Sequence, residues 1–205
     1  ITESLTVATP LILAGLAVAL PFKASLFNIG AQGQIILGAA FAGWVGFTLD
    51  LPPVIHMLVA VLAGAIGGGL WGFIPGILRA KTGAHEVITT IMLNHISVYL
   101  LAFLLTTTAF QRPGRADPIS PPVADSALYP PLFGSSFRLH WGFVLALIMC
   151  AAVWWLLYRS TKGFEFRAVG YNANAARTAG IKVERSYALV MVLAGALAGM
   201  AGTAQ

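Results

Sequence analysis

The chain has 205 residues, of which 58% are hydrophobic and only 9% are charged, and its mean hydropathy is +0.84. This number of charges is too small to cover the surface of a soluble globular protein. The composition therefore excludes a soluble domain and indicates a polytopic membrane protein. The formal net charge of +5 lies mainly between apolar stretches, where it reports topology and not nucleic-acid binding. The single cysteine, Cys150, lies inside an apolar stretch, which excludes a disulfide framework and a CxxC metal site.

Apolar stretches in chain order predict an all-α fold, a polytopic transmembrane helix bundle with about six spans of roughly 20 residues each. The expected spans are residues 4–22, 31–49, 54–78, 87–110 and 141–158, and a sixth that starts near Tyr187. The sequence begins without methionine and stops within the sixth apolar stretch. We therefore expect a single transmembrane domain over residues 1–205 that is truncated at both ends.

Basic residues predict how these spans are oriented. Residues 159–186 carry six Lys or Arg side chains against two Glu, so the positive-inside rule places this segment in the cytoplasm. Alternation of the spans puts Arg79 and Lys81 on the same side. It puts the Pro-rich loop 111–140 outside.

The basic segment also contains its own predicted structure. Residues 163–169 are expected to form a short helix that Gly170 stops, and Asn172 is expected to cap a second helix, 173–179, with Gly180 at C′. Its expected small-residue surface consists of Ala173, Ala175, Ala176 and Ala179. Two interpretations remain open: a protrusion that docks into a groove of another protein, or a basic loop held at anionic lipid head groups.

Small residues recur at every fourth position in three of the spans. This spacing forms grooves that let helix backbones approach closely, so it predicts tight helix packing. The residues are Ala60, Gly64, Gly68, Gly72 and Gly76 in the third span, Gly38, Ala42 and Gly46 in the second, and Gly195 and Gly199 in the sixth.

A first polar cluster, FNIGAQGQ, covers residues 27–34. It places Asn28, Gln32 and Gln34 beside two glycines, which weaken a helix and free backbone carbonyls. The favoured interpretation is a broken-helix segment that lines a translocation pathway. The alternative is a polar turn at the cytoplasmic interface that joins the first two spans.

A second polar cluster, GAHEVITTIMLNHIS, covers residues 83–97. Glu86, Thr90 and Asn94 follow each other at intervals of four residues and so share one face of the fourth span. Glu86 is expected at a helix N-terminus, bonding back toward Gly83. Asn94 lies deeper and needs a partner, either a neighbouring helix or a polar permeant.

Sequence motifs give no support for an enzyme. His85 and Glu86 begin an HExxH zinc-protease pattern, but position 89 is Thr89 and the next histidine, His95, is out of register. There is also no GxSxG elbow, no aspartate pair within a span and no Walker A sequence. We therefore expect neither catalysis nor a metal site, and no ATP hydrolysis by this chain.

Three segments together resemble a known family. FNIGAQGQ (27–34), EVITTIMLNHI (86–96) and FRAVGYNANAARTAGI (166–181) are similar to the permease subunits of bacterial ABC importers in the branched-chain amino acid/ribose permease superfamily. The nucleoside and simple-sugar branch is the most similar. That branch usually has Glu where this chain has Gln32, and Tyr where it has His95.

The resemblance implies a type II importer permease in the bacterial inner membrane, which translocates a nucleoside or simple sugar and holds no cofactor itself. Its implied partners are cytoplasmic ATP-binding subunits that bind ATP and Mg, a second permease subunit (homologous or identical), an external solute-binding lipoprotein and membrane lipid. Implied pathway residues are Asn28, Gly30, Gln32, Gly33 and Asn94. Implied coupling residues, which contact the ATPase, are Arg167, Gly170, Asn172, Ala175, Ala176, Arg177 and Gly180.

The competing interpretation is an ion-coupled secondary transporter or channel for a small polar solute. Such a protein needs an ionisable residue within the membrane to couple ion and solute. Apart from histidine, this sequence offers only Glu86 and Lys23, each near the end of a span.

Overall fold

A computed structural model describes residues 2–115, 117–132 and 139–204, and the expected all-helical bundle is confirmed across them. One isolated antiparallel bridge joins Pro131 to His140. The elements are α1 (Thr2–Phe22), α2 (Ala31–Thr48), α3 (Pro53–Thr82), α4 (Glu86–Leu104), the short 3-10 helix η1 (Asp125–Ala127), α5 (Gly142–Arg159), α6 (Thr161–Tyr171), α7 (Ala173–Thr178) and α8 (Val183–Gly202).

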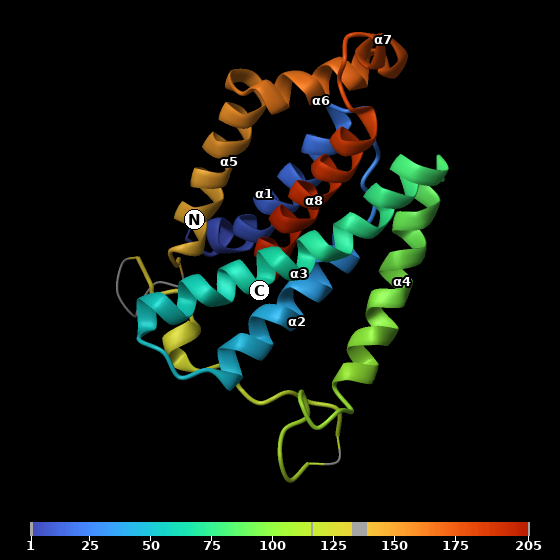
Figure 1. Cartoon of the computed structure of the whole chain (residues 1–205). Coiled ribbons are helices and arrows are strands. Elements are labelled where there is room, and N and C mark those ends of the chain that lie inside the picture. Colours follow the sequence, from blue (N-terminus) through green and yellow to red (C-terminus); the bar gives the residue numbers. More distant parts are fainter. Residues whose placement is uncertain (1, 116, 133–138, 205) are drawn as a thin grey trace.

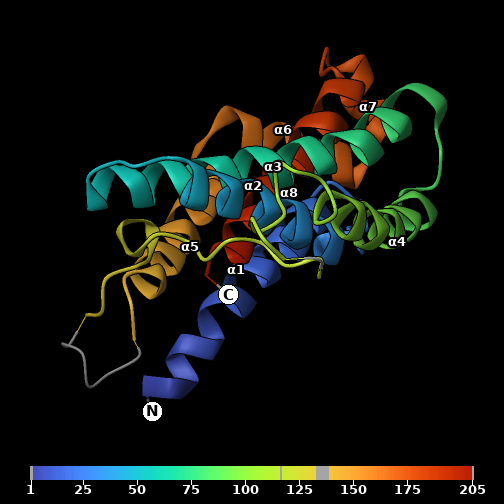
Figure 2. The same ribbon diagram turned by 90° about the horizontal axis from the view of Figure 1, so that it is seen from below.

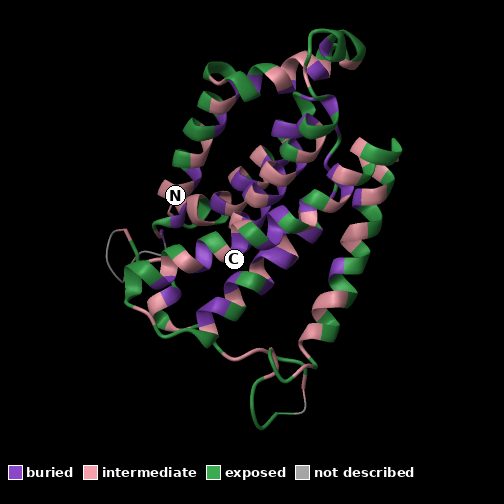
Figure 3. Cartoon of the chain, viewed as in Figure 1, coloured by how far each residue is buried: buried purple, intermediate pink, exposed green. Residues whose placement is uncertain are grey.

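Helices α2, α3 and α8 form the centre of the bundle. Figure 3 shows buried residues concentrated where these three helices face one another. Helices α4 and α5 lie on opposite sides of this centre, and much of their surface is exposed (Figures 1 and 2). The exposed residues are largely apolar, as expected for helices that face lipid.

In the part of the chain that the structure describes, helix α2 is the one expected span that does not combine the length and hydropathy of a membrane-spanning helix. Within the described ranges, five helices are long and apolar enough to cross a membrane: α1, α3, α4, α5 and α8. Helix α2 forms over the predicted residues but is not among these five, since its first turn carries Gln32 and Gln34. Because α3, α4 and α8 pack around it, Gln34 is buried in protein, whereas Gln32 stays exposed.

Several predicted boundaries were wrong. Helix α3 continues to Thr82, beyond the predicted end at 78. Helix α8 begins at Val183, whose side chain is buried, and so starts before the predicted position near Tyr187. The fourth helix ends at Leu104 and not at 110. Beyond it, the hydroxyls of Thr106 and Thr107 donate to the carbonyls of residues three positions earlier, a local bond that competes with helix continuation.

The predicted glycine grooves are confirmed between α3 and α8, which share the largest contact in the fold. A methyl group added at Gly68 would overlap the carbonyl oxygen of Gly195, and one added at Gly199 would overlap that of Gly64. Gly38 of α2 meets the same Gly199. Backbones therefore approach closely along the whole contact, which only residues without side chains permit.

The basic connections lie at one end of the bundle, which we call the basic end: it carries Lys23, Arg79, Lys81 and the α6–α7 unit. The Arg79 guanidinium lies 5.9 Å from the ring centroid of Tyr187, close to the start of α8. The described part of the Pro-rich loop lies at the opposite end (Figure 1). There Ala124 donates a backbone hydrogen bond to Gly46. This separation agrees with the predicted topology.

Candidate functional site

The connector between α1 and α2 carries non-helical backbone into the bundle. After Phe22 the chain turns through Ser25, whose φ is +54°, and then extends to Gly30. The Asn28 side chain donates to the carbonyl of Ala17 at 3.2 Å. Ala17 lies five residues before the end of α1, which is about 7 Å along the helix axis. The connector thus runs back beside α1, and α2 begins inside the bundle, as Figure 1 shows.

Asn28 and Gln34 form a closed pair of amides. Asn28 Nδ2 donates to Gln34 Oε1 at 2.9 Å, and Gln34 Nε2 donates to Asn28 Oδ1 at 3.1 Å. The backbone N–H of Gly30 donates to the same Asn28 oxygen. Each side chain is about 1% exposed, so the pair holds the connector in shape and does not face a cavity. Gln34, which the sequence analysis did not select as a site residue, is an equal partner here.

Asn94 joins the two polar clusters that the sequence analysis identified separately. Its Oδ1 accepts from the backbone N–H of Gly33, and its Nδ2 donates to the carbonyl of Ile29, both at 2.9 Å. The Gly33 N–H belongs to the first turn of α2, where amides have no partner within the helix. A side chain of α4 therefore caps α2. Of the two partners left open for Asn94, the structure supplies a neighbouring element.

The glycines of the connector make room for α4. A methyl group at Gly30 would lie 3.0 Å from Thr90 Cβ, and one at Gly33 would lie 3.0 Å from Asn94 Oδ1. Thr90 is fully buried and donates to the carbonyl of Glu86 at 2.7 Å. The predicted face of α4 thus packs directly on the start of α2.

Two polar side chains near this junction have capacity left for a ligand. Gln32 is exposed and makes no hydrogen bond with the described residues. The Trp71 indole N–H on α3 is buried without an acceptor in the described structure, and it lies 3.0 Å from a methyl group built at Gly33. Trp71 is not among the residues predicted from the sequence, although a tryptophan within a run of glycines was a visible signal.

Glu86 does not bond back to Gly83 as predicted. Its side chain is 5% exposed, and Oε2 lies 3.4 Å from Nε of Arg79, so the two groups form an ion pair and not a short hydrogen bond. Arg79 uses a second nitrogen to donate to the Gly83 carbonyl at 3.1 Å. The ion pair ties the end of α3 to the start of α4.

Helix α6 is longer than predicted, and Gly170 does not stop it. It begins after Ser160, whose side chain accepts from the Gly163 N–H, and it runs through Gly170 to Tyr171. A methyl group at Gly170 would overlap the carbonyl oxygen of Lys23, and Ser25 Oγ donates to the Gly170 carbonyl at 2.7 Å. The glycine is therefore needed for close contact between α6 and the connector.

Helix α7 has the predicted cap and end. Asn172 Oδ1 accepts from the backbone N–H groups of Asn174 and Ala175, each at 3.0 Å. The helix ends at Thr178, and Gly180 adopts the left-handed conformation with φ of +86°. Figure 1 shows α7 beyond the ends of the long helices.

The predicted small-residue surface of α7 was partly wrong. Ala176 is 4% exposed and packs in a small core with Val169 and Val183. Ala175 and Arg177 are exposed, and Arg177 pairs with Glu184 at 2.8 Å. A helix of one and a half turns must bury one face to stay in place, so Ala176 is structural and the opposite face is free.

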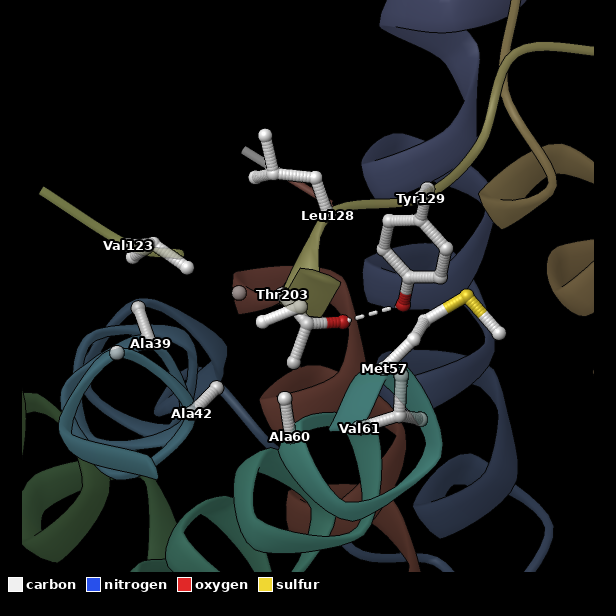
Figure 4. A pocket seen from close by; sticks show the side chains of 12 residues that line it. Ala39, Ala42, Met57, Ala60, Val61, Val123, Leu128, Tyr129 and Thr203 are labelled. Atoms are coloured by element: carbon white, nitrogen blue, oxygen red, sulfur yellow. Dashed lines mark hydrogen bonds between the residues drawn. The ribbon is translucent and has the colours of Figure 1, made fainter. Parts of the chain in front are cut away.

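A pocket of about 170 Å³ lies at the end opposite the basic end, between α2, α3, α8 and the Pro-rich loop (Figure 4). Its wall is mostly small and apolar, including Ala39, Ala60 and Val61. The Tyr129 hydroxyl bonds to Thr203 Oγ1 at 2.7 Å, and burial raises the pKa of Tyr129. None of the implied pathway residues lines this pocket. Among the described residues, no cluster of His, Cys, Asp and Glu could hold a metal ion.

Over its full length, residues 1–205, the chain matches the family described as the branched-chain amino acid transport system / permease component. It is 40% identical over 200 residues to the guanosine ABC transporter permease protein NupP of Bacillus subtilis, covering 98% of this chain and 58% of the relative. It is 39% identical to the glucose ABC transporter permease protein TsgB13 of Haloferax volcanii, covering 100% of this chain and 56% of the relative.

It is also 36% identical to the nucleoside ABC transporter permease protein NupB of Lactococcus lactis, over 98% of this chain and 57% of the relative. The chain therefore spans somewhat more than half the length of these relatives. No solved structure matches it significantly.

Proposed function

Because the chain belongs to the branched-chain amino acid transport system / permease component family, we propose that it forms part of the membrane-spanning permease subunit of an ATP-driven importer. The observation that carries this proposal is the family match over all 205 residues. The chain has five helices of membrane-spanning length and composition within the described ranges. The two-helix unit formed by α6 and α7 lies at the basic end of the bundle.

The transported solute is a nucleoside or a simple sugar. Relatives named for guanosine, nucleoside and glucose transport are 36% to 40% identical to this chain. The host membrane is a bacterial inner membrane, where an external solute-binding lipoprotein delivers the solute. A second permease subunit, homologous or identical, completes the pathway.

The α6–α7 unit is the contact for cytoplasmic ATP-binding subunits, which carry ATP and Mg. Its exposed side chains, such as Ala175 and Arg177, are available for docking. Asn172, Ala176 and Gly180 act indirectly, because they fix the shape of α7 through its cap, its core and its end. Arg167 lies apart from α7, where its guanidinium covers the Tyr158 ring.

A continuous set of contacts leads from the docking unit to the start of α2. Gly170 in α6 packs on Lys23, and Ser25 bonds to the Gly170 carbonyl. The connector then reaches Asn28, which is bonded to Gln34 in α2. Movement of α6 during the ATPase cycle is thereby passed to α2 and, through Asn94, to α4. Rigid-body rocking of packed elements of this kind opens a pathway alternately to each side.

The pathway runs beside the junction of α2, α3 and α4. Asn28, Gly30, Gly33 and Asn94 shape it by holding the connector, whereas the free amide of Gln32 is the group that contacts solute. Weak and few bonds suit transport, because a carrier must release what it admits.

Co-purification and uptake with Ala175→Glu test the docking assignment. The full-length protein is co-expressed with its ATP-binding and solute-binding partners, and retained ATPase and ATP-driven uptake of radiolabelled guanosine and glucose are measured. Ala175 is the suitable position because Ala176 is buried and a charge there would disrupt α7 itself. Thr82→Glu is the matched control, since Thr82 is exposed at the basic end outside α6 and α7.

We expect Ala175→Glu to lose the ATPase and at least tenfold of the uptake, while Thr82→Glu retains both. Equal retention by the two variants would contradict the docking assignment. Uptake that needs an ion gradient and no ATPase would instead support the ion-coupled transporter.

A further inference from the structure

A polar cavity of about 310 Å³ lies at the basic end, where three helices meet. The last residue of α1, Phe22, and the start of the connector, Lys23 and Ser25, form one side of it. Tyr158 comes from the last turn of α5, and Arg167 and Tyr171 come from α6. It is separate from the free face of α7 and from the junction of α2 with α4.

The cavity carries two cationic side chains and, among the described residues, no carboxylate lines it. Lys23 and Arg167 also have no ion-pair partner in the described part of the chain. Neighbouring basic residues differ: Lys162 is paired with Glu165 at 2.8 Å, and Arg177 with Glu184. Two cations facing one cavity without counter-charge repel each other, so an anion between them lowers the electrostatic energy.

The Arg167 guanidinium is positioned by a neighbouring ring and keeps hydrogen-bond donors available for such an anion. Its guanidinium lies 5.3 Å from the ring centroid of Tyr158, within the range of a cation–π contact. Within the described residues, its one hydrogen bond is a long one of 3.4 Å from Nε to the Gly163 carbonyl. Its terminal nitrogens stay free, and guanidinium geometry suits phosphate oxygens.

An exposed stripe of α5 connects the cavity to the bilayer. Tyr158, Trp154, Ala151 and Leu147 follow at spacings of three or four residues, so they share one face, and all four are exposed. Trp and Tyr are enriched where a helix crosses the membrane interface. An amphiphile whose acyl chains lie along this stripe would place its head group at the cavity.

We propose that this cavity binds the phosphate of an anionic phospholipid head group, with Lys23 and Arg167 as its cationic ligands. A basic pocket between membrane helices at the cytoplasmic side has the chemistry that such head groups select. The lipid is favoured over free phosphate because the cavity adjoins an apolar, lipid-facing helix surface. The proposal goes beyond the transport function and does not depend on it, since the site needs no solute and no ATPase.

Native mass spectrometry of the detergent-purified full-length protein tests this site. The probes are dioleoyl phosphatidylglycerol, dioleoyl phosphatidylcholine and inorganic phosphate alone. The test variant is Lys23→Gln with Arg167→Gln. The matched control, Lys81→Gln with Lys162→Gln, removes the same charge from two exposed side chains outside the cavity and away from the α5 stripe.

We expect the unmodified protein to retain phosphatidylglycerol but not phosphatidylcholine. Each lost cation should weaken retention about fivefold, so the test variant should bind more than tenfold less. The matched control should bind like the unmodified protein, and Arg167→Lys should recover part of the loss. An equal loss in both double variants would overturn the site. Inorganic phosphate retained as strongly as the lipid would overturn the lipid assignment.

Both double variants are first compared by thermal unfolding. If only the test variant is unstable, the single variant Lys23→Gln takes its place, because Lys23 is an exposed side chain without a described bond. Retention in that variant unchanged from the unmodified protein would also overturn the proposal. Uptake is not part of either measurement, so this proposal and the transport function can fail separately.

Discussion

Asn94 is a single side chain that holds the start of one helix from the middle of another. Both polar atoms of its amide are used, one by the Gly33 N–H and one by the Ile29 carbonyl. These two backbone groups lie at a helix start and in an extended connector, and neither has another bond partner among the described residues. Removing the amide therefore leaves the Gly33 N–H and the Ile29 carbonyl without these hydrogen bonds.

Asn94→Leu is expected to lower the free energy of unfolding by about 1 to 2 kcal/mol, the usual net contribution of two hydrogen bonds, because one of them is exposed and the other is partly buried. Unfolding of the full-length protein by SDS titration in mixed micelles measures this. His95→Leu is the control, since His95 is the exposed neighbour on the same helix. Equal stability of the two variants would mean that Asn94 does not cap α2.

His140 predicts a pH dependence at the end of α5. Burial lowers the pKa of His140 below its usual value of 6.5, and its Nδ1 accepts from the Gly142 N–H at 3.1 Å. The folded state therefore favours the neutral ring, while the unfolded chain takes up a proton below 6.5. This contribution to stability is present above pH 6.5 and is lost as pH falls toward the folded-state pKa.

Thermal unfolding between about pH 8 and about pH 5 checks this dependence, which lies in the range where histidine titrates. We expect the Tm of the natural protein to fall below about pH 6.5, and that of His140→Gln to fall less. Parallel curves for the two proteins would contradict the role of His140.

At the scale of elements, the α3–α8 contact depends on glycine positions and not on apolar surface alone. Lipid is as apolar as the helix faces, so dispersion between close backbones drives the association. Gly68→Ala should push the two helices apart and cost about 1 to 3 kcal/mol, as overpacking does. SDS titration compares it with Gly15→Ala.

Gly15 is the informative control because a methyl group there has no described atom within 4 Å. Replacing an exposed helix glycine by alanine raises helix propensity, so Gly15→Ala should be neutral or stabilising by up to about 1 kcal/mol. A Gly68→Ala protein as stable as Gly15→Ala would show that the α3–α8 backbones have room to spare.

For the whole molecule, the topology predicts which end faces the cytoplasm. In a protein whose Cys150 is replaced by Ser, single cysteines are placed at exposed positions: Thr178→Cys in α7 and Pro122→Cys in the Pro-rich loop. A membrane-impermeant maleimide should label Pro122→Cys in intact cells. It should label Thr178→Cys only after permeabilisation, because basic segments stay inside. Labelling of Thr178→Cys from outside would reverse the orientation.

The sequence by itself determined the helical membrane class, the order and approximate position of the long helices, the small-residue packing and the cap of α7. These features depend on apolar length, small-residue spacing and local side-chain bonds, all of which act between residues that are near in sequence. It also identified both polar clusters around Asn28 and Asn94. Its errors at residue 104 and at Gly170 arose where a nearby hydroxyl or a distant backbone decided the outcome.

Only the tertiary structure decided how those pieces act on one another. That Asn94 caps α2, that Ala176 is buried and that Gly170 packs on Lys23 each depend on residues brought together from far apart in the chain. A polar residue in an apolar stretch indicates that it needs a hydrogen-bond partner, but the sequence does not identify that partner. The partner is set by helix packing, because away from water a polar group can bond only to what the fold places beside it.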